Sequence, residues 1–207
     1  MNGKMIGKGA EAELFLTRLQ GKKAVCKKRV KKEYRVPELD SRLRVERTKR
    51  ESRILVRVKE ASVPCPTVFH VNLESKQIFM SFVKGDLLRK KIDSIEWGKL
   101  KRILKEIGEG LGRMHSAGIA HGDCTTSNIM VSRAGEVTWI DFGLSSFTQS
   151  VEEHATDLLL LKKSLSLPQF NIVLRAYAKS NRNSPAVFAR LAEIEKRGRY
   201  VVRAMVK

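Results

Sequence analysis

The stretches HGDCTTSN, residues 121–128, and IDFG, residues 140–143, carry the strongest structural signal in this chain. Four residues separate Asp123 from Asn128. Asp141 follows after short apolar couplets that are typical of a β-hairpin. Asp, Asn, Ser and Gly all favour turns, so each stretch alone would fit an ordinary polar loop. Both together, in this order and at this spacing, indicate a catalytic site instead of two turns.

The chemistry that fits these residues is phosphoryl transfer by a protein-kinase-like enzyme. A nucleoside triphosphate carries too much negative charge to be approached without a divalent metal, and Mg²⁺ prefers oxygen ligands. Asn128 and Asp141 are the expected Mg²⁺ ligands, with Asn128 also touching the nucleotide. Asp123 is the expected catalytic residue, which aligns the attacking hydroxyl or water and accepts its proton. The sequence therefore predicts an ATP- and Mg²⁺-dependent phosphotransferase.

The N-terminal third should supply the other half of this site. The segment IGKGAEAEL, residues 6–14, lies between two extended runs, where a loop that covers the phosphates belongs. Ala12 replaces the third glycine of a kinase loop, so this segment alone would read as a hairpin turn. The residues expected to contact the nucleotide from this loop are Ile6, Gly7, Lys8, Gly9, Ala10, Glu11, Ala12 and Leu14.

The segment AVCK, residues 24–27, resembles the strand that presents a phosphate-binding lysine. Lys28 is the rival of Lys27, but strand alternation puts the two on opposite faces, and the spacing favours Lys27. Glu51, an acid within a strongly basic predicted helix, is the expected partner that orients Lys27. Glu46 is the alternative partner.

The order of the predicted elements is strands first and helices afterwards, which indicates an α+β fold. We expect a reduced, two-lobed protein-kinase-like fold, with a small β-rich N-lobe over residues 1–83 and a short helical C-lobe over residues 84–207. The predicted strands cover residues 5–6, 12–16, 23–28, 68–71 and 77–83. The predicted helices cover residues 39–60, 97–114, 158–167 and 170–178, and a last one opens at Ser184 and Pro185.

Several features of conventional protein kinases are missing. Gly122 stands where an Arg precedes the catalytic Asp, and the Ala-Pro-Glu sequence after the metal-binding Asp does not occur. Asp157, which could brace the catalytic loop, follows Asp141 closely, so a long substrate-docking segment does not fit between them. This pattern predicts a small-substrate phosphotransferase or an ATPase that works inside an assembly.

Composition and charge limit the choice of partners. With 42% apolar and 30% charged residues the chain is globular, and 41 Lys and Arg against 22 Asp and Glu give a net charge of +19. Polyanions are the partners to expect for such a surface. The 3 cysteines lack metal or redox spacing, and we expect neither a signal peptide nor a membrane span, hence no membrane partner. These features favour the cytosol or the nucleus, without a choice between them.

The chain resembles the small atypical kinase/ATPase subunit of the KEOPS (EKC) complex, an assembly needed for threonylcarbamoyl modification of tRNA. The resemblance runs from about Gly7 to Arg199. It is carried by the string GDCTTSN at residues 122–128, by GAEA at 9–12, by KKEYRVPELD at 31–40, by IDFGLS at 140–145 and by KRGR at 196–199. Departures are Cys124 where Leu is expected, Ser81 where an acid is expected, and Tyr200-Val201-Val202 in place of a more basic tail.

The resemblance implies that the protein binds ATP with Mg²⁺ and phosphorylates itself on serine or threonine. It also implies that ATP hydrolysis supports the formation of threonylcarbamoyladenosine (t6A) on tRNA. It also implies two partners, the tRNA threonylcarbamoyltransferase subunit and a small regulatory subunit on the N-lobe. The basic stretches 27–35, 42–59 and 196–207 predict tRNA contact through phosphates, although the tail could dock on the partner enzyme instead. Alternatives are a silent pseudokinase scaffold and a small-molecule phosphotransferase, the latter needing a larger helical lobe.

Overall fold

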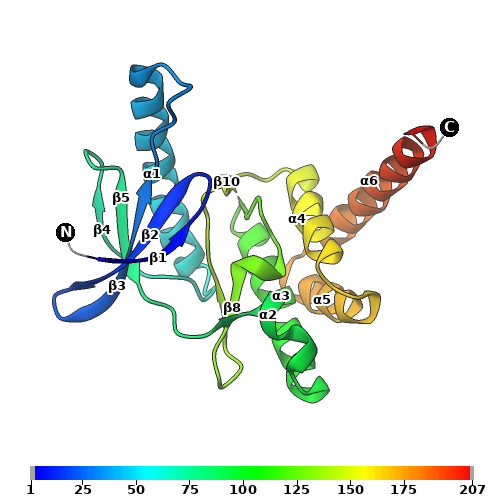
Figure 1. The fold of residues 1–207 in the computed structure, drawn as a ribbon. Helices are drawn as coiled ribbons and strands as arrows, with labels where there is room; N and C mark the ends of the chain where they lie inside the picture. The colour runs from blue at the N-terminus through cyan, green and yellow to red at the C-terminus, as the bar shows by residue number, and fades with distance from the viewer. Residues whose placement is uncertain (1–2, 206–207) are drawn as a thin grey trace.

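The structure is a computed structural model that describes residues 3–205, with side chains described for residues 3–197 (Figure 1). Figure 1 shows a β-sheet with one long helix against it in the left part of the view and a helical part on the right. This arrangement confirms the predicted α+β fold, with strands first and helices afterwards. From residue 198 on, the predicted basic tail lies outside the described side chains.

The sheet near the N-terminus is antiparallel and has the strand order β1-β2-β3-β5-β4. Its strands are β1 (Lys4–Lys8), β2 (Ala12–Leu19), β3 (Lys22–Arg29), β4 (Val68–Asn72) and β5 (Gln77–Ser81). They cover the five predicted strands, and β5 ends two residues before the predicted residue 83. β3 lies in the centre of the sheet, so side chains on its inner face are buried.

The long helix α1 (Pro37–Glu60) lies against this sheet and contacts β4 and β5. Its buried apolar residues Ile54, Leu55 and Val58 form an apolar stripe. The helix begins two residues earlier than predicted because a proline fits the first turn, where acidic Glu38 also complements the helix dipole.

The central helix of the helical part is α3 (Trp97–Ser116), which the sequence predicts over residues 97–114. It turns its apolar face inward, and Gly118, at φ +74°, follows its end. The short elements before it are β6 (Asp86–Leu87), α2 (Leu88–Lys91) and the 3₁₀ turn η1 (Ile92–Ser94).

Short strands hold the loops that follow α3. β6 pairs with β8 (Ile129–Val131), which forms a hairpin with β9 (Val137–Trp139), and β7 (Ile119–Ala120) pairs with β10 (Ser146–Phe147). A 3₁₀ turn, η2 (Thr126–Asn128), leads into β8. The two polar stretches of the sequence are therefore the loops on either side of the β8–β9 hairpin.

The last three helices are α4 (Val151–Lys163), α5 (Leu167–Ser180) and α6 (Ser184–Met205). The predicted helices over residues 158–167 and 170–178 were wrong in their bounds. α4 begins seven residues earlier because the side chain of Ser150 accepts a hydrogen bond from the N–H of Glu153 at its N-terminus. α5 begins three residues earlier because Ser166 and Gln169 form a capping box. α6 begins where Ser184 predicts.

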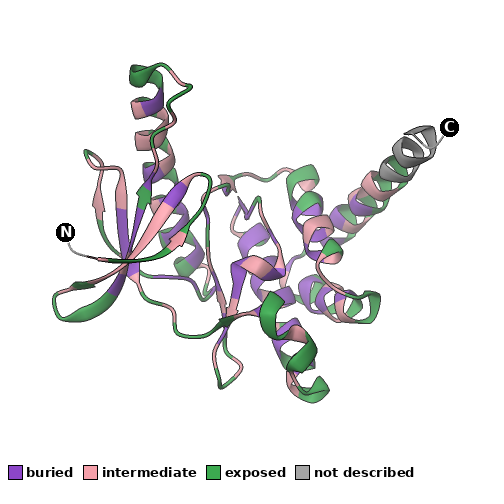
Figure 2. Cartoon of the chain, in the orientation of Figure 1, coloured by how far each residue is buried: buried purple, intermediate pink, exposed green. Residues whose placement is uncertain are grey.

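Buried residues concentrate on α3 and on the elements packed around it (Figure 2). One apolar cluster continues from α1 and β5 through α3 to α5 and includes Trp139 and Phe142, so the parts before and after residue 84 share a core. Within the described residues, no helix is both long and apolar enough to cross a membrane.

Candidate active site

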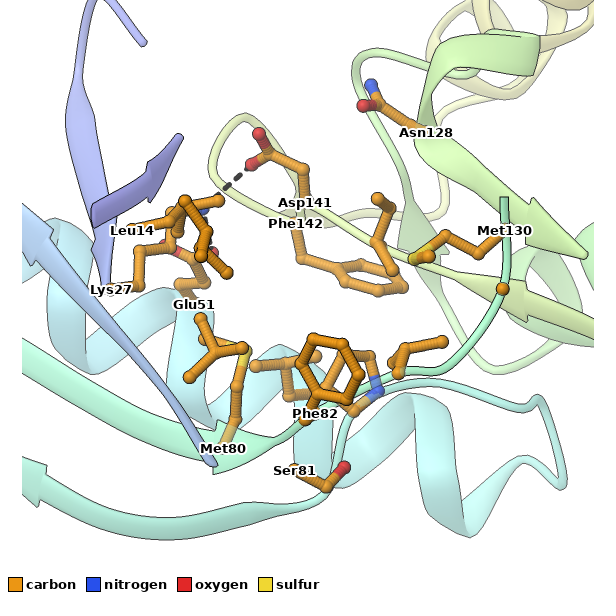
Figure 3. Close-up of a pocket in the computed structure, with 17 residues that line it drawn as sticks. Leu14, Lys27, Glu51, Met80, Ser81, Phe82, Asn128, Met130, Asp141 and Phe142 are labelled. Carbon is orange, nitrogen blue, oxygen red and sulfur yellow. Dashed lines mark hydrogen bonds and ion pairs between the residues drawn. The ribbon is translucent and has the colours of Figure 1, made fainter. Parts of the chain in front are cut away.

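Lys27 lies at the centre of an ionic cluster between the sheet and α1. Lys27 and Arg29 occupy the buried face of β3, whereas Lys28 is exposed, so the structure turns Lys27 and not its rival inward. Lys27 Nζ lies 2.5 Å from Glu51 Oε1 and 2.7 Å from Asp141 Oδ1. Figure 3 shows the second of these contacts as a dashed line across the cleft. Glu51 is buried on α1, and the alternative Glu46 is exposed.

The charges of this cluster support one another. Burial works to lower the pKa of Lys27, but the carboxylates of Glu51 and Asp141 outweigh it and the pKa is raised. Burial works to raise the pKa of Asp141, but the charge and the hydrogen bond of Lys27 outweigh it and the pKa is lowered. Lys27 is therefore a cation and Asp141 a carboxylate near neutral pH.

The loop between β7 and β8 holds Asp123 and Asn128 together. Asn128 Nδ2 donates to the main-chain oxygen of Asp123 at 2.8 Å and to Asp123 Oδ2 at 2.7 Å. Asn128 is 9% exposed, so its amide is fixed against the loop. This contact orients the carboxyl of Asp123 and leaves its other oxygen, Oδ1, for a ligand.

Asp157 on α4 supports this loop from behind. Its Oδ2 accepts the N–H of His121 at 2.6 Å, and its Oδ1 accepts the N–H of Gly122 at 2.8 Å. His115 Nε2 lies 3.2 Å from Asp157 Oδ2. Burial alone would raise the pKa of Asp157, but the contact with His115 outweighs it and the pKa is lowered. Asp157 braces the catalytic loop as the sequence suggests.

The loop after β9 carries Asp141 at φ +59° and turns Phe142 into the core, where it is 1% exposed. The ring of Phe142 lies 4.8 Å from the ring of His121, centre to centre. Asp141 Oδ1 also accepts the N–H of Gly143 at 3.2 Å. The buried Phe142 thus anchors the loop and holds Asp141 at the mouth of the cleft.

Every residue that the sequence predicts for the site lines one or both of two adjoining cavities. The inner one, about 260 Å³, is mostly apolar and lies between the sheet, the segment after β5 and the β8–β9 hairpin (Figure 3). Its predicted residues are Ile6, Leu14, Lys27, Glu51, Asn128 and Asp141. The outer one, about 380 Å³, is lined by the predicted residues Gly7, Lys8, Gly9, Ala10, Glu11, Ala12, Leu14, Lys27, Asp123 and Asp141.

The glycine-rich loop between β1 and β2 closes over the outer cavity. Gly9 N–H donates to Ala12 O at 2.9 Å, which makes the loop a tight turn. Glu11 is ion-paired with Arg47 of α1, and that hydrogen bond is the main cause of its lowered pKa. The loop is therefore fastened to α1 through Glu11.

Comparisons with known proteins agree with this geometry. The model of the protein kinase domain family matches residues 1–163. The KEOPS complex subunit Bud32 of Pyrococcus abyssi is 37% identical over 218 aligned residues, which cover 98% of this chain and 99% of that protein. The chain is a member of the Bud32 family within the protein kinase superfamily. A Methanobrevibacter smithii protein named "probable bifunctional tRNA threonylcarbamoyladenosine biosynthesis protein" is 39% identical over 95% of this chain, which spans 36% of that protein.

Asp141 and Asn128 offer oxygen atoms in the cleft that suit a magnesium ion. Asp141 Oδ2 accepts no hydrogen bond from the described residues, and Asn128 uses its amide nitrogen toward Asp123, which leaves its carbonyl oxygen available. Carboxylate and amide oxygens suit Mg²⁺. Among the described residues, no cluster of three or more His, Cys, Asp or Glu side chains could hold a metal ion.

Two parts of this candidate site were not predicted from the sequence. Arg29 binds the second oxygen of Glu51, with Nη2 2.5 Å from Oε2, and its position two residues after Lys27 on a strand was a usable signal. The apolar wall of the inner cavity gives no such signal, because its residues come from separate elements. Its members include Val25, Met80, Phe82, Val83, Met130, Ile140 and Phe142.

Proposed function

We propose that this protein is an Mg²⁺-dependent ATPase and serine/threonine protein kinase that serves as a KEOPS subunit in the formation of t6A on tRNA. The convergence of Lys27, Glu51, Asp123, Asn128 and Asp141 on two adjoining cavities carries the proposal. The names of the relatives from Pyrococcus and Methanobrevibacter support the biological setting.

The triphosphate fits the boundary between the two cavities. The apolar inner cavity suits the adenine ring, and the outer cavity suits the phosphates beneath the glycine-rich loop. Glu51 holds Lys27 in place, so that its charge is directed at the phosphates without reorganisation. Mg²⁺ held by Asn128 and Asp141 would neutralise charge on the phosphate oxygens.

The transfer step requires alignment more than covalent chemistry. Asn128 fixes the carboxyl of Asp123 so that it can accept the proton of the attacking water or hydroxyl. The bond from the new oxygen to phosphorus forms as the bond to the ADP oxygen breaks. Water as nucleophile gives hydrolysis, and a serine or threonine hydroxyl gives a phosphorylated protein.

The test of this function compares γ-phosphate release and transfer from radiolabelled ATP by the wild type, Asp123→Asn and Asp93→Asn. Asp93 is exposed and distant from the site in sequence, so its variant is the matched control. We expect roughly a hundredfold or greater loss in Asp123→Asn and none in the control. Equal turnover in all three proteins would show that Asp123 is not the catalytic residue, and no turnover in the wild type would favour the silent scaffold.

We further propose two protein partners, the tRNA threonylcarbamoyltransferase subunit and a small regulatory subunit on the N-lobe. Affinity purification of the native protein tests the first, since the transferase should co-elute. We propose tRNA contact through the basic segments, which should weaken steeply with salt. A cytosolic or nuclear location completes the proposal, since the free thiols of Cys26, Cys65 and Cys124 suit a reducing compartment.

A further inference from the structure

Arg29 stands beside Lys27 on the buried face of β3. Lys27 is 7% exposed and Arg29 is 3% exposed, and both line the outer cavity. They share one carboxylate, because Glu51 Oε1 lies 2.5 Å from Lys27 Nζ and Glu51 Oε2 lies 2.5 Å from Arg29 Nη2. Two buried cations thus meet a single buried acid.

The remaining acids near this pair lie at the surface. Asp141, which binds Lys27, has a side chain 57% exposed, and Glu11, 3.7 Å from Arg29 Nη1, has one 42% exposed. Once Asp141 binds Mg²⁺, its charge is no longer available to Lys27. A surplus positive charge would then be buried, which is costly unless an anion enters.

Arg29 also has donor capacity to spare. Its Nε is buried and makes no hydrogen bond to the described residues. A Cβ atom placed on Gly143 would lie 3.5 Å from Lys27 Nζ and 3.8 Å from Arg29 Nη2, so both cations face the same side-chain-free space. Arginine presents a fork of N–H donors that matches phosphate oxygens.

We infer that Arg29 is a second triphosphate-binding residue, which binds the phosphate groups of ATP beside Lys27. The inference rests on the proposed function, since it requires ATP in the cleft. The competing explanation is that Arg29 acts only through Glu51, as a positioning residue for Lys27. The two differ in what the loss of Arg29 does once Glu51 no longer carries a charge.

The experiment measures equilibrium binding of MgATP and of adenosine to the wild type, Arg29→Met and Lys28→Met. Lys28→Met is the matched control, because it removes the positive charge of an exposed side chain on the same strand. We expect Arg29→Met to bind MgATP about 10- to 100-fold more weakly and adenosine within about twofold of the wild type. The control should keep both affinities.

A double-mutant cycle with Glu51→Gln separates the two explanations. If Arg29 contacts phosphate, Arg29→Met must weaken MgATP binding again in the Glu51→Gln protein. No further loss there, or equal losses for adenosine and MgATP in the single variant, would overturn the inference. A thermal unfolding transition checks folding, and Arg29→Gln, which can still donate to Glu51, replaces Arg29→Met if that variant does not fold. If the wild type binds no MgATP, the proposed function fails instead.

Discussion

The backbone oxygen of Leu144 lies 2.4 Å from the point that a Cβ atom would occupy on Gly122. Gly122 has φ +80°, a conformation that L side chains rarely adopt. In conventional protein kinases an arginine precedes the catalytic Asp. Here neither arginine nor any other side chain with a Cβ atom fits this backbone without movement of the Leu144 segment. The absence of that arginine is thus part of the local fold, and not only the loss of a contact to a phosphorylated segment.

Gly122→Ala should therefore lower the free energy of unfolding by about 2 to 4 kcal/mol, from backbone conformation and steric clash together. Gly21→Ala is the matched control, because Gly21 has φ +77° and no atom within 4 Å of its Cβ position. The control should lose only about 1 to 2 kcal/mol. Chemical denaturation of both variants measures the difference, and equal losses would show that Leu144 yields freely.

Asp157→Ala should reduce both stability and turnover. The substitution leaves the N–H groups of His121 and Gly122 without their acceptor, and the buried N–H of His121 alone should cost about 1 to 3 kcal/mol. It also releases the loop that carries Asp123, so we expect a lower kcat for ATP. Asp93→Ala, on an exposed position, is the control and should change neither quantity. Full turnover in Asp157→Ala would remove the bracing role.

His154 should make the protein less stable in mild acid. Burial and then the neighbouring charge of His115 lower its pKa to about 4, against 6.5 for the ordinary side chain. Between these two values the unfolded chain binds a proton that the folded protein does not, so stability falls as the pH falls from about 6.5 to about 4.

We expect the wild type to lose about 2 kcal/mol more than His154→Phe between neutral pH and pH 4.5, after allowance for solvent screening. Phenylalanine keeps a ring on His115, whose own ring is stacked 4.1 Å away. Denaturation at several pH values measures the effect, and the exposed His70→Phe is the control. Parallel pH profiles for the wild type and His154→Phe would contradict this assignment.

Local chemistry made most of the fold predictable. Strand alternation puts Lys27 and Lys28 on opposite faces, and the spacing of the segment 24–27 favours Lys27. The apolar stripe of Ile54, Leu55 and Val58 marks α1 as a helix packed on a sheet. The spacing of Asp123, Asn128 and Asp141 indicates one site because a short hairpin brings the ends of its two flanking loops together.

What the sequence analysis missed depends on distant pairing or on caps. The start of α4 depends on Ser150, whose capping bond lies in a stretch without apolar periodicity. Arg29 looks like one more basic residue in a basic strand until Glu51 meets it from α1. The apolar wall of the inner cavity arises only when β5, the segment after it and the β8–β9 hairpin meet.

The most direct test of a metal-bound nucleotide in this cleft is γ-phosphate release from radiolabelled ATP during a Mg²⁺ titration. Asp141→Ala is compared with the wild type and with Asp86→Ala, whose carboxylate is exposed. We expect Mg²⁺-dependent turnover in the wild type and the control, and a loss of about a hundredfold or more in Asp141→Ala with the unfolding transition retained. Unchanged turnover in a folded Asp141→Ala would contradict the account.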